Sequence, residues 1–146
     1  MTGNRPATVR FYIVADILGL ALVLAALRSD VTYPGDPGDV IQRRARPACP
    51  VVTPATPDPE WIPAVTRRGW LIVTRDHHIQ DHRAEIGAVR TYGARMVALS
   101  AAEARGTFAQ LEIVMCQWRA IERLLDLDGP FIYTATRTRL EPVQLS

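Results

Sequence analysis

The chain has 146 residues, a net charge of +2 at pH 7 and 48% hydrophobic residues. This length is enough for one domain with a full hydrophobic core, the composition is that of an ordinary globular protein, and the small charge does not by itself require a nucleic-acid partner. All 17 basic residues are arginine. The absence of lysine either reflects a GC-rich genome or serves the bidentate contacts that arginine makes with phosphate and carboxylate.

The two cysteines, Cys49 and Cys116, form no CxxC pair. Cys116 falls on the apolar face of a predicted helix, so we expect a buried, reduced thiol there. Because the chain has no disulfide framework, we expect a cytoplasmic protein.

Residues 1–9 are expected to be flexible, and residues 11–27 form the most apolar run, FYIVADILGLALVLAAL. At about 17 residues the run is shorter than the roughly 20 that span a bilayer. Asp16 would also cost about 2.5–3.5 kcal/mol near the membrane centre. We therefore predict a strand at 11–15 and a helix at 16–28 with Asp16 as N-cap, and no contact with a membrane. A membrane anchor is the alternative, and carbonate extraction would leave it in the pellet.

The next part of the chain is rich in turn residues. A short strand at 31–33 is followed by the sequence PGDPGD, and residues 34–57 are predicted to form a long surface loop. That loop contains three arginines, Arg43, Arg44 and Arg46. Asp58 is the predicted N-cap of a helix over 60–68, with Pro59 at its first position.

The apolar run at 70–73 predicts a central strand that is buried on both faces. A helix over about 79–92, a strand at 95–99, a helix near 107–125 and an edge strand at 131–136 are predicted to follow. An apolar stripe in helix 107–125 predicts its core face, namely Phe108, Leu111, Met115, Trp118 and Leu125. Strands that alternate with helices predict a three-layer α/β/α sandwich around a mostly parallel sheet, with residues 1–146 as one domain.

Acidic residues stand where strands are predicted to end. Asp16 follows the first strand and Asp76 follows the central one, and the carboxyl ends of parallel strands share one edge of the sheet. The long loop before Asp58 leaves the position of that residue open. Two carboxylates 4 Å apart repel by roughly 4 kcal/mol at a dielectric of 20, so a convergent cluster either shares a proton or binds a hard cation. Mg²⁺ or Mn²⁺ suits such a cluster, and phosphodiester hydrolysis is the natural chemistry.

Each candidate has a structural alternative. Asp16 and Asp58 can serve as helix caps alone, and Asp76 can solvate a strand end. The histidines lack the Cys or HExxH spacing of a zinc site, so polar residues at a helix start are favoured; they are His77, His78 and His82. Glu85 faces either the site or solvent. Further candidates are Arg75 and His78 beside Asp76, and four arginines that either hold RNA phosphates or belong to an ordinary surface, namely Arg43, Arg44, Arg67 and Arg68.

Three segments resemble the PIN-like domain family, and more narrowly the VapC-type toxin ribonucleases of bacterial toxin–antitoxin pairs. They are FYIVADILGLALVLAALRSDVTYPGDPGD, TPDPEWIPAVTRRGWLIVTRDHHIQDHRAEI and FIYTATRTRL, and the likeness runs from about residue 11 to 143. The resemblance implies a metal-dependent endoribonuclease in which Asp16, Asp58 and Asp76 hold Mg²⁺ or Mn²⁺, which activates a water against the RNA backbone. It also implies a cognate antitoxin that blocks the site, and homodimers are common in such families.

The chain departs from the family pattern at one position. The resemblance implies an Asp at the end of the first strand, two residues before a second polar residue, and this chain has Val14 and Asp16 at these places. Residues i and i+2 of a strand point to the same side, so Val14 puts an apolar group where a metal ligand is expected. The chain is therefore either an impaired nuclease or a catalytically inactive module that binds RNA or an antitoxin.

Two other α/β classes place acids at strand ends, phosphorylation receiver domains and phosphatases with an aspartyl nucleophile. Resemblance to either would imply a lysine near the phosphate. This chain contains none, which argues against both classes.

Overall fold

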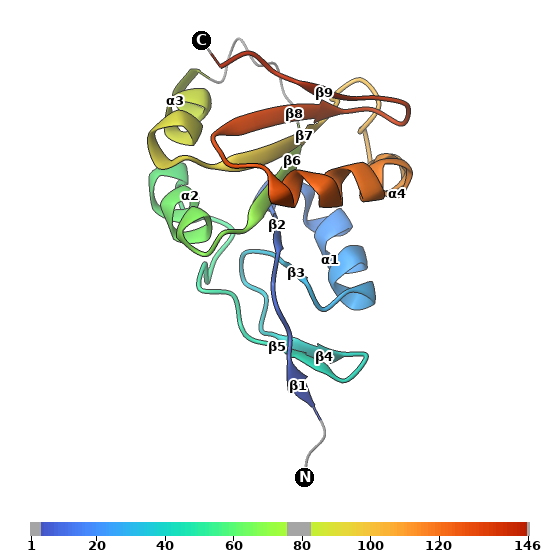
Figure 1. The fold of residues 1–146 in the computed structure, drawn as a ribbon. Coiled ribbons are helices and arrows are strands. Elements are labelled where there is room, and N and C mark those ends of the chain that lie inside the picture. Colours follow the sequence, from blue (N-terminus) through green and yellow to red (C-terminus); the bar gives the residue numbers. More distant parts are fainter. Residues whose placement is uncertain (1–3, 76–82, 146) are drawn as a thin grey trace.

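A computed structural model describes residues 4–75 and 83–145 (Figure 1). Its main sheet has the strand order β3-β2-β6-β7-β8-β9. Neighbouring strands are parallel except for the last pair, in which β9 runs antiparallel to β8. The strands are β2 (Phe11–Ile13), β3 (Val31–Thr32), β6 (Leu71–Arg75), β7 (Arg95–Leu99), β8 (Phe131–Ala135) and β9 (Leu140–Pro142).

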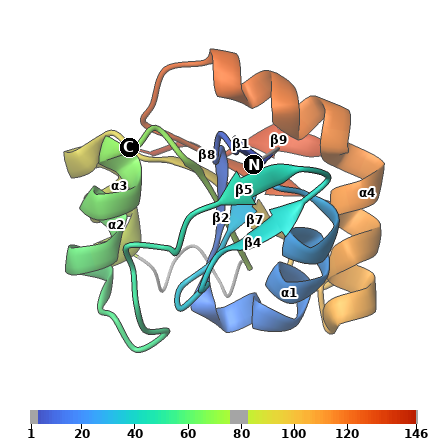
Figure 2. The same ribbon diagram turned by 90° about the horizontal axis from the view of Figure 1, so that it is seen from below.

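Two layers of helices cover this sheet (Figure 2). One face carries α1 (Leu18–Leu27) and α4 (Thr107–Arg123), and the other carries α2 (Asp58–Arg67) and α3 (Arg83–Tyr92). Phe11 and Tyr12 mark the two faces, since the Phe11 ring lies 4.8 Å from Trp118 of α4 and the Tyr12 ring lies 5.2 Å from Trp61 of α2. The predicted α/β/α sandwich with a mostly parallel sheet is confirmed.

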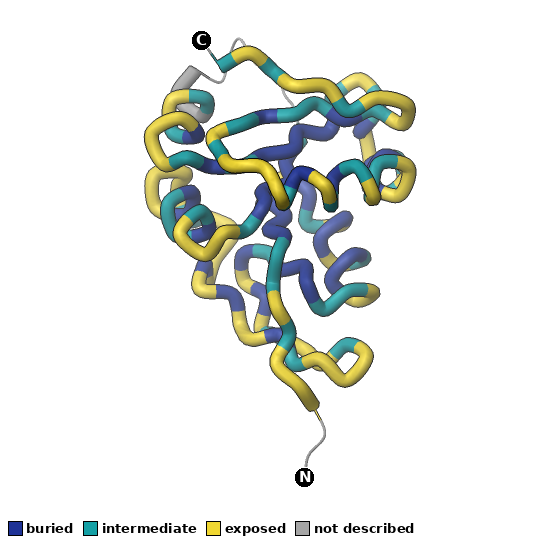
Figure 3. Tube along the Cα trace, viewed as in Figure 1, coloured by how far each residue is buried: buried dark blue, intermediate teal, exposed yellow. Residues whose placement is uncertain are grey.

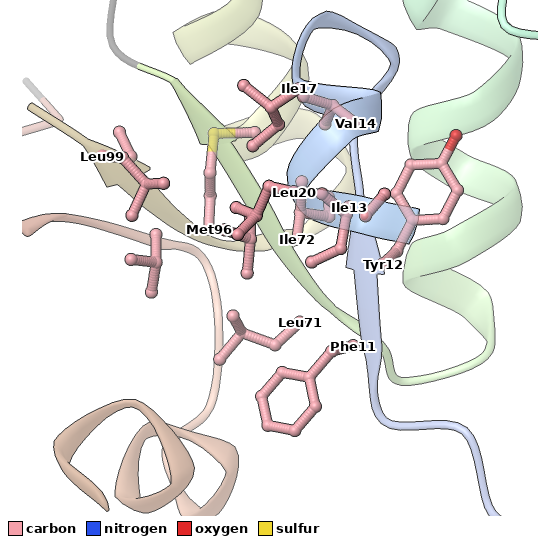
Figure 4. Close-up of a cluster of buried hydrophobic side chains, with 14 of the residues drawn as sticks. Phe11, Tyr12, Ile13, Val14, Ile17, Leu20, Leu71, Ile72, Met96 and Leu99 are labelled. Atoms are coloured by element: carbon pink, nitrogen blue, oxygen red, sulfur yellow. The ribbon is translucent and has the colours of Figure 1, made fainter. Parts of the chain in front are cut away.

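The core lies along the central strands (Figures 3 and 4). Leu71, Ile72 and Val73 are at most 1% exposed, as expected for an apolar run covered on both faces. Figure 4 shows Tyr12 pointing toward α2, away from Phe11 and Leu71. Successive residues of a strand point to opposite faces, so both helical layers are anchored to the same short strand, β2.

The helix starts differ from the predictions. Asp16 is not an N-cap: it lies inside a short 3-10 helix, η1 (Ala15–Ile17), whose N-cap is Val14, and α1 then starts at Leu18. The chain turns straight from the strand into a tight helix, which leaves no extended position for Asp16. Asp58 is also not the cap of its helix, because Pro57 takes that place and Asp58 is the first helical residue. None of the described helices is long and apolar enough to cross a membrane.

The predicted core face of α4 is wrong at two positions. Phe108 is 79% and Met115 66% exposed, whereas Ile113 and Ile121 are fully buried. Apolar residues occur on both sides of this helix, so periodicity alone does not decide which side packs on the sheet. Cys116 lies on the outer side and is exposed, contrary to the expected buried thiol.

A second, smaller sheet forms within segments that were expected to lack regular structure. Its strand order is β1-β5-β4, and its strands are β1 (Arg5–Pro6), β4 (Asp39–Ile41) and β5 (Arg44–Arg46). The predicted flexible start therefore contributes a strand, and the predicted surface loop contains a hairpin. Such strands of two or three residues, rich in arginine, are too short to show a period. The expected edge strand, β8, is in turn covered by β9.

Candidate active site

The candidate site lies at the carboxyl ends of β2 and β6. These strands are parallel neighbours, paired from Phe11 with Leu71 to Ile13 with Val73, and the Val14 amide donates a hydrogen bond of 3.1 Å to the Val73 carbonyl. The strand order reverses here, because the chain passes from β2 to β3 on one side of β2 and later enters β6 on its other side. Open α/β sheets bind ligands in the crevice beyond such a reversal.

Asp16 lies at this rim. It belongs to η1, which packs against β6, and its side chain is exposed to solvent. The strand β6 ends at the same rim with Arg75, the residue before Asp76. Asp76 itself, His77, His78, Asp81 and His82 lie outside the described residues. The convergence of Asp16 with Asp76 therefore stays a prediction, and the geometry of β2 and β6 is compatible with it.

Val14 closes the strand end with an apolar side chain. It continues the extended backbone of β2, with φ −71° and ψ 162°, and is only 6% exposed. The alternation of β2 places it on the same side as Tyr12, and Figure 4 shows it beside Ile17. An isopropyl group offers no electron pair, so any cation at this rim depends on the oxygens of neighbouring residues.

Asp58 reaches the α2 side of β2. Its Oδ1 accepts a hydrogen bond of 2.9 Å from the indole Nε1 of Trp61, and that indole stacks on Tyr12. Burial raises the pKa of the Tyr12 hydroxyl well above its usual range, with smaller contributions from Cys49 and then from the charge of Asp58. Tyr12 therefore stays protonated at all working pH values. Asp58 is exposed, and one of its oxygens is already engaged.

Arg75 ends β6 and is half-buried as a residue. Its Nε is buried and has no hydrogen-bond partner among the described residues. A buried donor that lacks a partner costs about 1–3 kcal/mol, and such groups in folded proteins call for an explanation, for example a ligand. The burial of this Nε–H means that only an acceptor inside the rim can satisfy it.

Asp36, in the middle of the YPGDPGD sequence, takes a structural role that sequence reasoning missed. It is 2% exposed and accepts hydrogen bonds from Arg46 Nε at 2.7 Å, from Thr32 Oγ1 at 2.8 Å and from the Gly38 amide at 2.9 Å. Arg46 also donates to the carbonyl oxygens of Ala25 and Arg28 at the end of α1. The ion pair fixes the turn to α1, and both oxygens of the Asp36 carboxylate accept hydrogen bonds from within the protein. Arg46, expected on a surface loop, is buried.

The residues present allow a limited test of a metal site. Within the residues that the structure describes, no three His, Cys, Asp or Glu side chains come together to hold a metal ion. Of Glu85, only its place in the first turn of α3 is described. Mg²⁺ keeps several waters and needs only one or two carboxylates, so Asp16 with one strand-end acid suffices in donor chemistry.

A family model described as a PIN-like domain matches residues 24–101, more than half of the chain. The chain belongs to the PIN-like domain family. The match includes Asp58 and Asp76 and starts after Val14 and Asp16, so it does not depend on the altered end of β2. No curated protein and no solved structure matches this PIN-like chain.

Proposed function

We propose that this PIN-like domain is a Mg²⁺- or Mn²⁺-dependent endoribonuclease, the toxin of a VapC-type toxin–antitoxin pair in the cytoplasm, and that Val14 weakens its activity. The observation that carries the proposal is the rim where β2 and β6 end side by side. It brings η1, with Asp16, against the strand that leads into Asp76. Nuclease chemistry is further supported by membership of the PIN-like family.

In this proposal Asp16 and Asp76 hold the cation, with Asp58 as the third candidate ligand. A bound divalent cation supplies Lewis-acid stabilisation of the scissile phosphate and an activated water. The Arg75 guanidinium, at the end of β6, is the candidate that orients the strand to be cut by hydrogen bonding to its phosphate. Further candidates for the same rim are His78 and Glu85.

The weakened activity follows from the packing of Val14. Its side chain is 6% exposed and fills the end of β2 with apolar surface, so a cation held by Asp16 and Asp76 would have one anionic ligand fewer. Affinity for hard cations depends on the number of charged ligands. Such a chain binds its cation weakly and cuts slowly.

The same observation favours a second candidate function, a catalytically inactive PIN-like module that binds RNA or an antitoxin without cleavage. Both candidates share their proposed partners, which are RNA and a cognate antitoxin protein, and a homodimer is part of the proposal for each. They differ in whether the rim still supports a cation.

Cleavage of a single-stranded RNA with Mn²⁺ or with EDTA distinguishes them. We expect slow cleavage by the unaltered chain, faster cleavage by Val14→Asp, and none by Asp76→Asn. Val14→Asn is the matched control, since it has the size and polarity of Asp without its charge, and it should not increase the rate. If all four proteins behave alike, with or without Mn²⁺, the nuclease proposal is wrong. If only Val14→Asp cleaves, the inactive module is correct.

A further inference from the structure

A cavity of about 440 Å³ opens at the opposite rim, where the strands of the main sheet begin. Arg10 enters it from the start of β2, Arg28 and Ser29 from the link between α1 and β3, and Gln42 and Arg44 from the β4–β5 hairpin. Val14 and Asp16 lie at the other end of β2, so this cavity is separate from the candidate active site.

One carboxylate orients two of the cavity's arginines. Asp30 accepts hydrogen bonds from Arg10 Nε and Nη2 at 3.1 and 2.7 Å, and from Arg28 Nε and Nη2 at 2.9 and 3.0 Å. Glu122 accepts a further bond of 3.2 Å from Arg10 Nη2. The Nη1 groups of both arginines make no hydrogen bond within the described residues. The guanidinium groups are therefore held in place while each keeps donors for another anion.

Charge in this region is not balanced. Arg10 and Arg28 face Asp30 and Glu122, but Arg44 has no ion-pair partner among the described residues and leaves the wall of the cavity with a net positive charge. An anionic ligand would satisfy this excess.

The positive charge continues onto the small sheet. Arg5 of β1 is the register partner of Arg44 in β5, and the Arg5 amide donates a hydrogen bond of 2.9 Å to the Arg43 carbonyl. We call these three residues, Arg5, Arg43 and Arg44, the arginine row. In the described structure none of them has an acidic partner. Like charges on paired strands repel, so a polyanion that lies along the row would stabilise the small sheet.

The hairpin turn adds a second unfavourable feature. Gln42 and Arg43 both have positive φ, 51° and 65°, as the central residues of a type I′ turn do, where Gly and Asn fit most easily. The turn therefore holds two long polar residues in a backbone conformation that they rarely adopt, and one of them, Gln42, lines the cavity. Both side chains are exposed, so an anionic partner can contact them.

We propose that the cavity and the arginine row bind the phosphate backbone of single-stranded nucleic acid, as a site distinct from the strand-end rim. The guanidinium groups offer paired N–H donors that match phosphate oxygens. A row of charges that continues into a cavity suits a chain of phosphates better than a single phosphate ion. The proposal does not depend on cleavage at the other rim.

Fluorescence anisotropy with a labelled single-stranded RNA, in EDTA and over a series of salt concentrations, tests this proposal. Arg43 and Arg44 are both exposed, so Arg43→Gln and Arg44→Gln should fold, and a thermal melt verifies that they do. Arg90→Gln, on the exposed side of α3, is the control with the same change in charge. We expect each variant in the row to weaken binding and to reduce the slope of log affinity against log salt by about 0.7 per lost contact, whereas the control leaves the slope unchanged.

Equal effects of Arg44→Gln and Arg90→Gln would overturn the proposal, because binding would then depend on net charge alone. Inorganic pyrophosphate, added as a competitor, separates the sources of phosphate: displacement of RNA only at high concentration supports a backbone site, and displacement at concentrations comparable to those of RNA phosphate contradicts it. Asp76→Asn separates the two sites. Loss of cleavage with unchanged RNA binding would support a binding site apart from the strand-end rim.

Discussion

The buried pair of Arg46 and Asp36 offers the sharpest test of how the sequence determines this fold. Their side chains are 3% and 1% exposed, and Arg46 Nε lies 2.7 Å from Asp36 Oδ2. The substitution Arg46→Met keeps most of the length of the side chain and removes its charge. It leaves a buried carboxylate with only the Thr32 hydroxyl and the Gly38 amide as donors, and it also takes the side-chain donor from the last carbonyls of α1.

The size of the effect follows from these contacts. Removal of one partner from a buried ion pair costs about 3–5 kcal/mol, which is a large share of the roughly 5–15 kcal/mol that stabilise a typical domain. Urea denaturation followed by far-ultraviolet circular dichroism measures it. With a slope of about 2 kcal/mol per molar urea, the midpoint should fall by about 2 M.

A double variant supplies the control. Arg46→Met combined with Asp36→Leu removes both charges, and the loss should then be much smaller, since an apolar replacement of a buried pair is often close to neutral. A loss below about 1 kcal/mol for Arg46→Met alone would refute the reasoning, because the buried carboxylate would then not need its partner. A double variant as unstable as the single one would show that volume, and not charge, decides.

Two further predictions concern a carboxylate and the thiols. Burial alone would raise the pKa of Asp30, but hydrogen bonds from Arg28 and Arg10 hold it below its ordinary value of 3.8, so the stability that this carboxylate provides is complete above pH 3.8 and is lost as the pH falls toward its folded pKa. Asp30→Asn should therefore flatten the acid side of a plot of unfolding free energy against pH, and an unchanged plot would contradict this role of Asp30. Cys116 is exposed, whereas Cys49 is 4% exposed and has a pKa raised by burial. Ellman's reagent should therefore modify Cys116 at once and Cys49 only upon unfolding, and equal reactivity of the two thiols would show that Cys49 is not buried.

The sequence was sufficient for elements whose pattern is local. The apolar run that became β6 and the strand predicted at 95–99, which is β7, were found because a strand buried on both faces needs an unbroken apolar sequence. The parallel order followed from the alternation of strands and helices. The same logic predicted that Asp16 lies at the rim where β6 ends. It did not predict that Asp16 lies inside the short 3-10 helix instead of capping α1.

Features that depend on contacts between distant residues could not be predicted in this way. Phe108 and Met115 form as regular a stripe as the residues of α4 that are buried, and only the position of the sheet selects one side. The pair of Asp36 and Arg46 joins two positions in a segment without periodicity, and the short strands around Arg44 gain their stability from one another.

Binding of Mn²⁺, followed by the electron paramagnetic resonance signal of the free ion, tests the central claim that acids at the strand ends hold a divalent cation. We expect weak binding by the unaltered chain, further loss in Asp16→Asn and Asp76→Asn, and affinity that is about tenfold tighter in Val14→Asp because a charged ligand is added, with no gain in Val14→Asn. The same weak affinity in all five proteins would contradict the account, because it would show that no cation lies among these side chains.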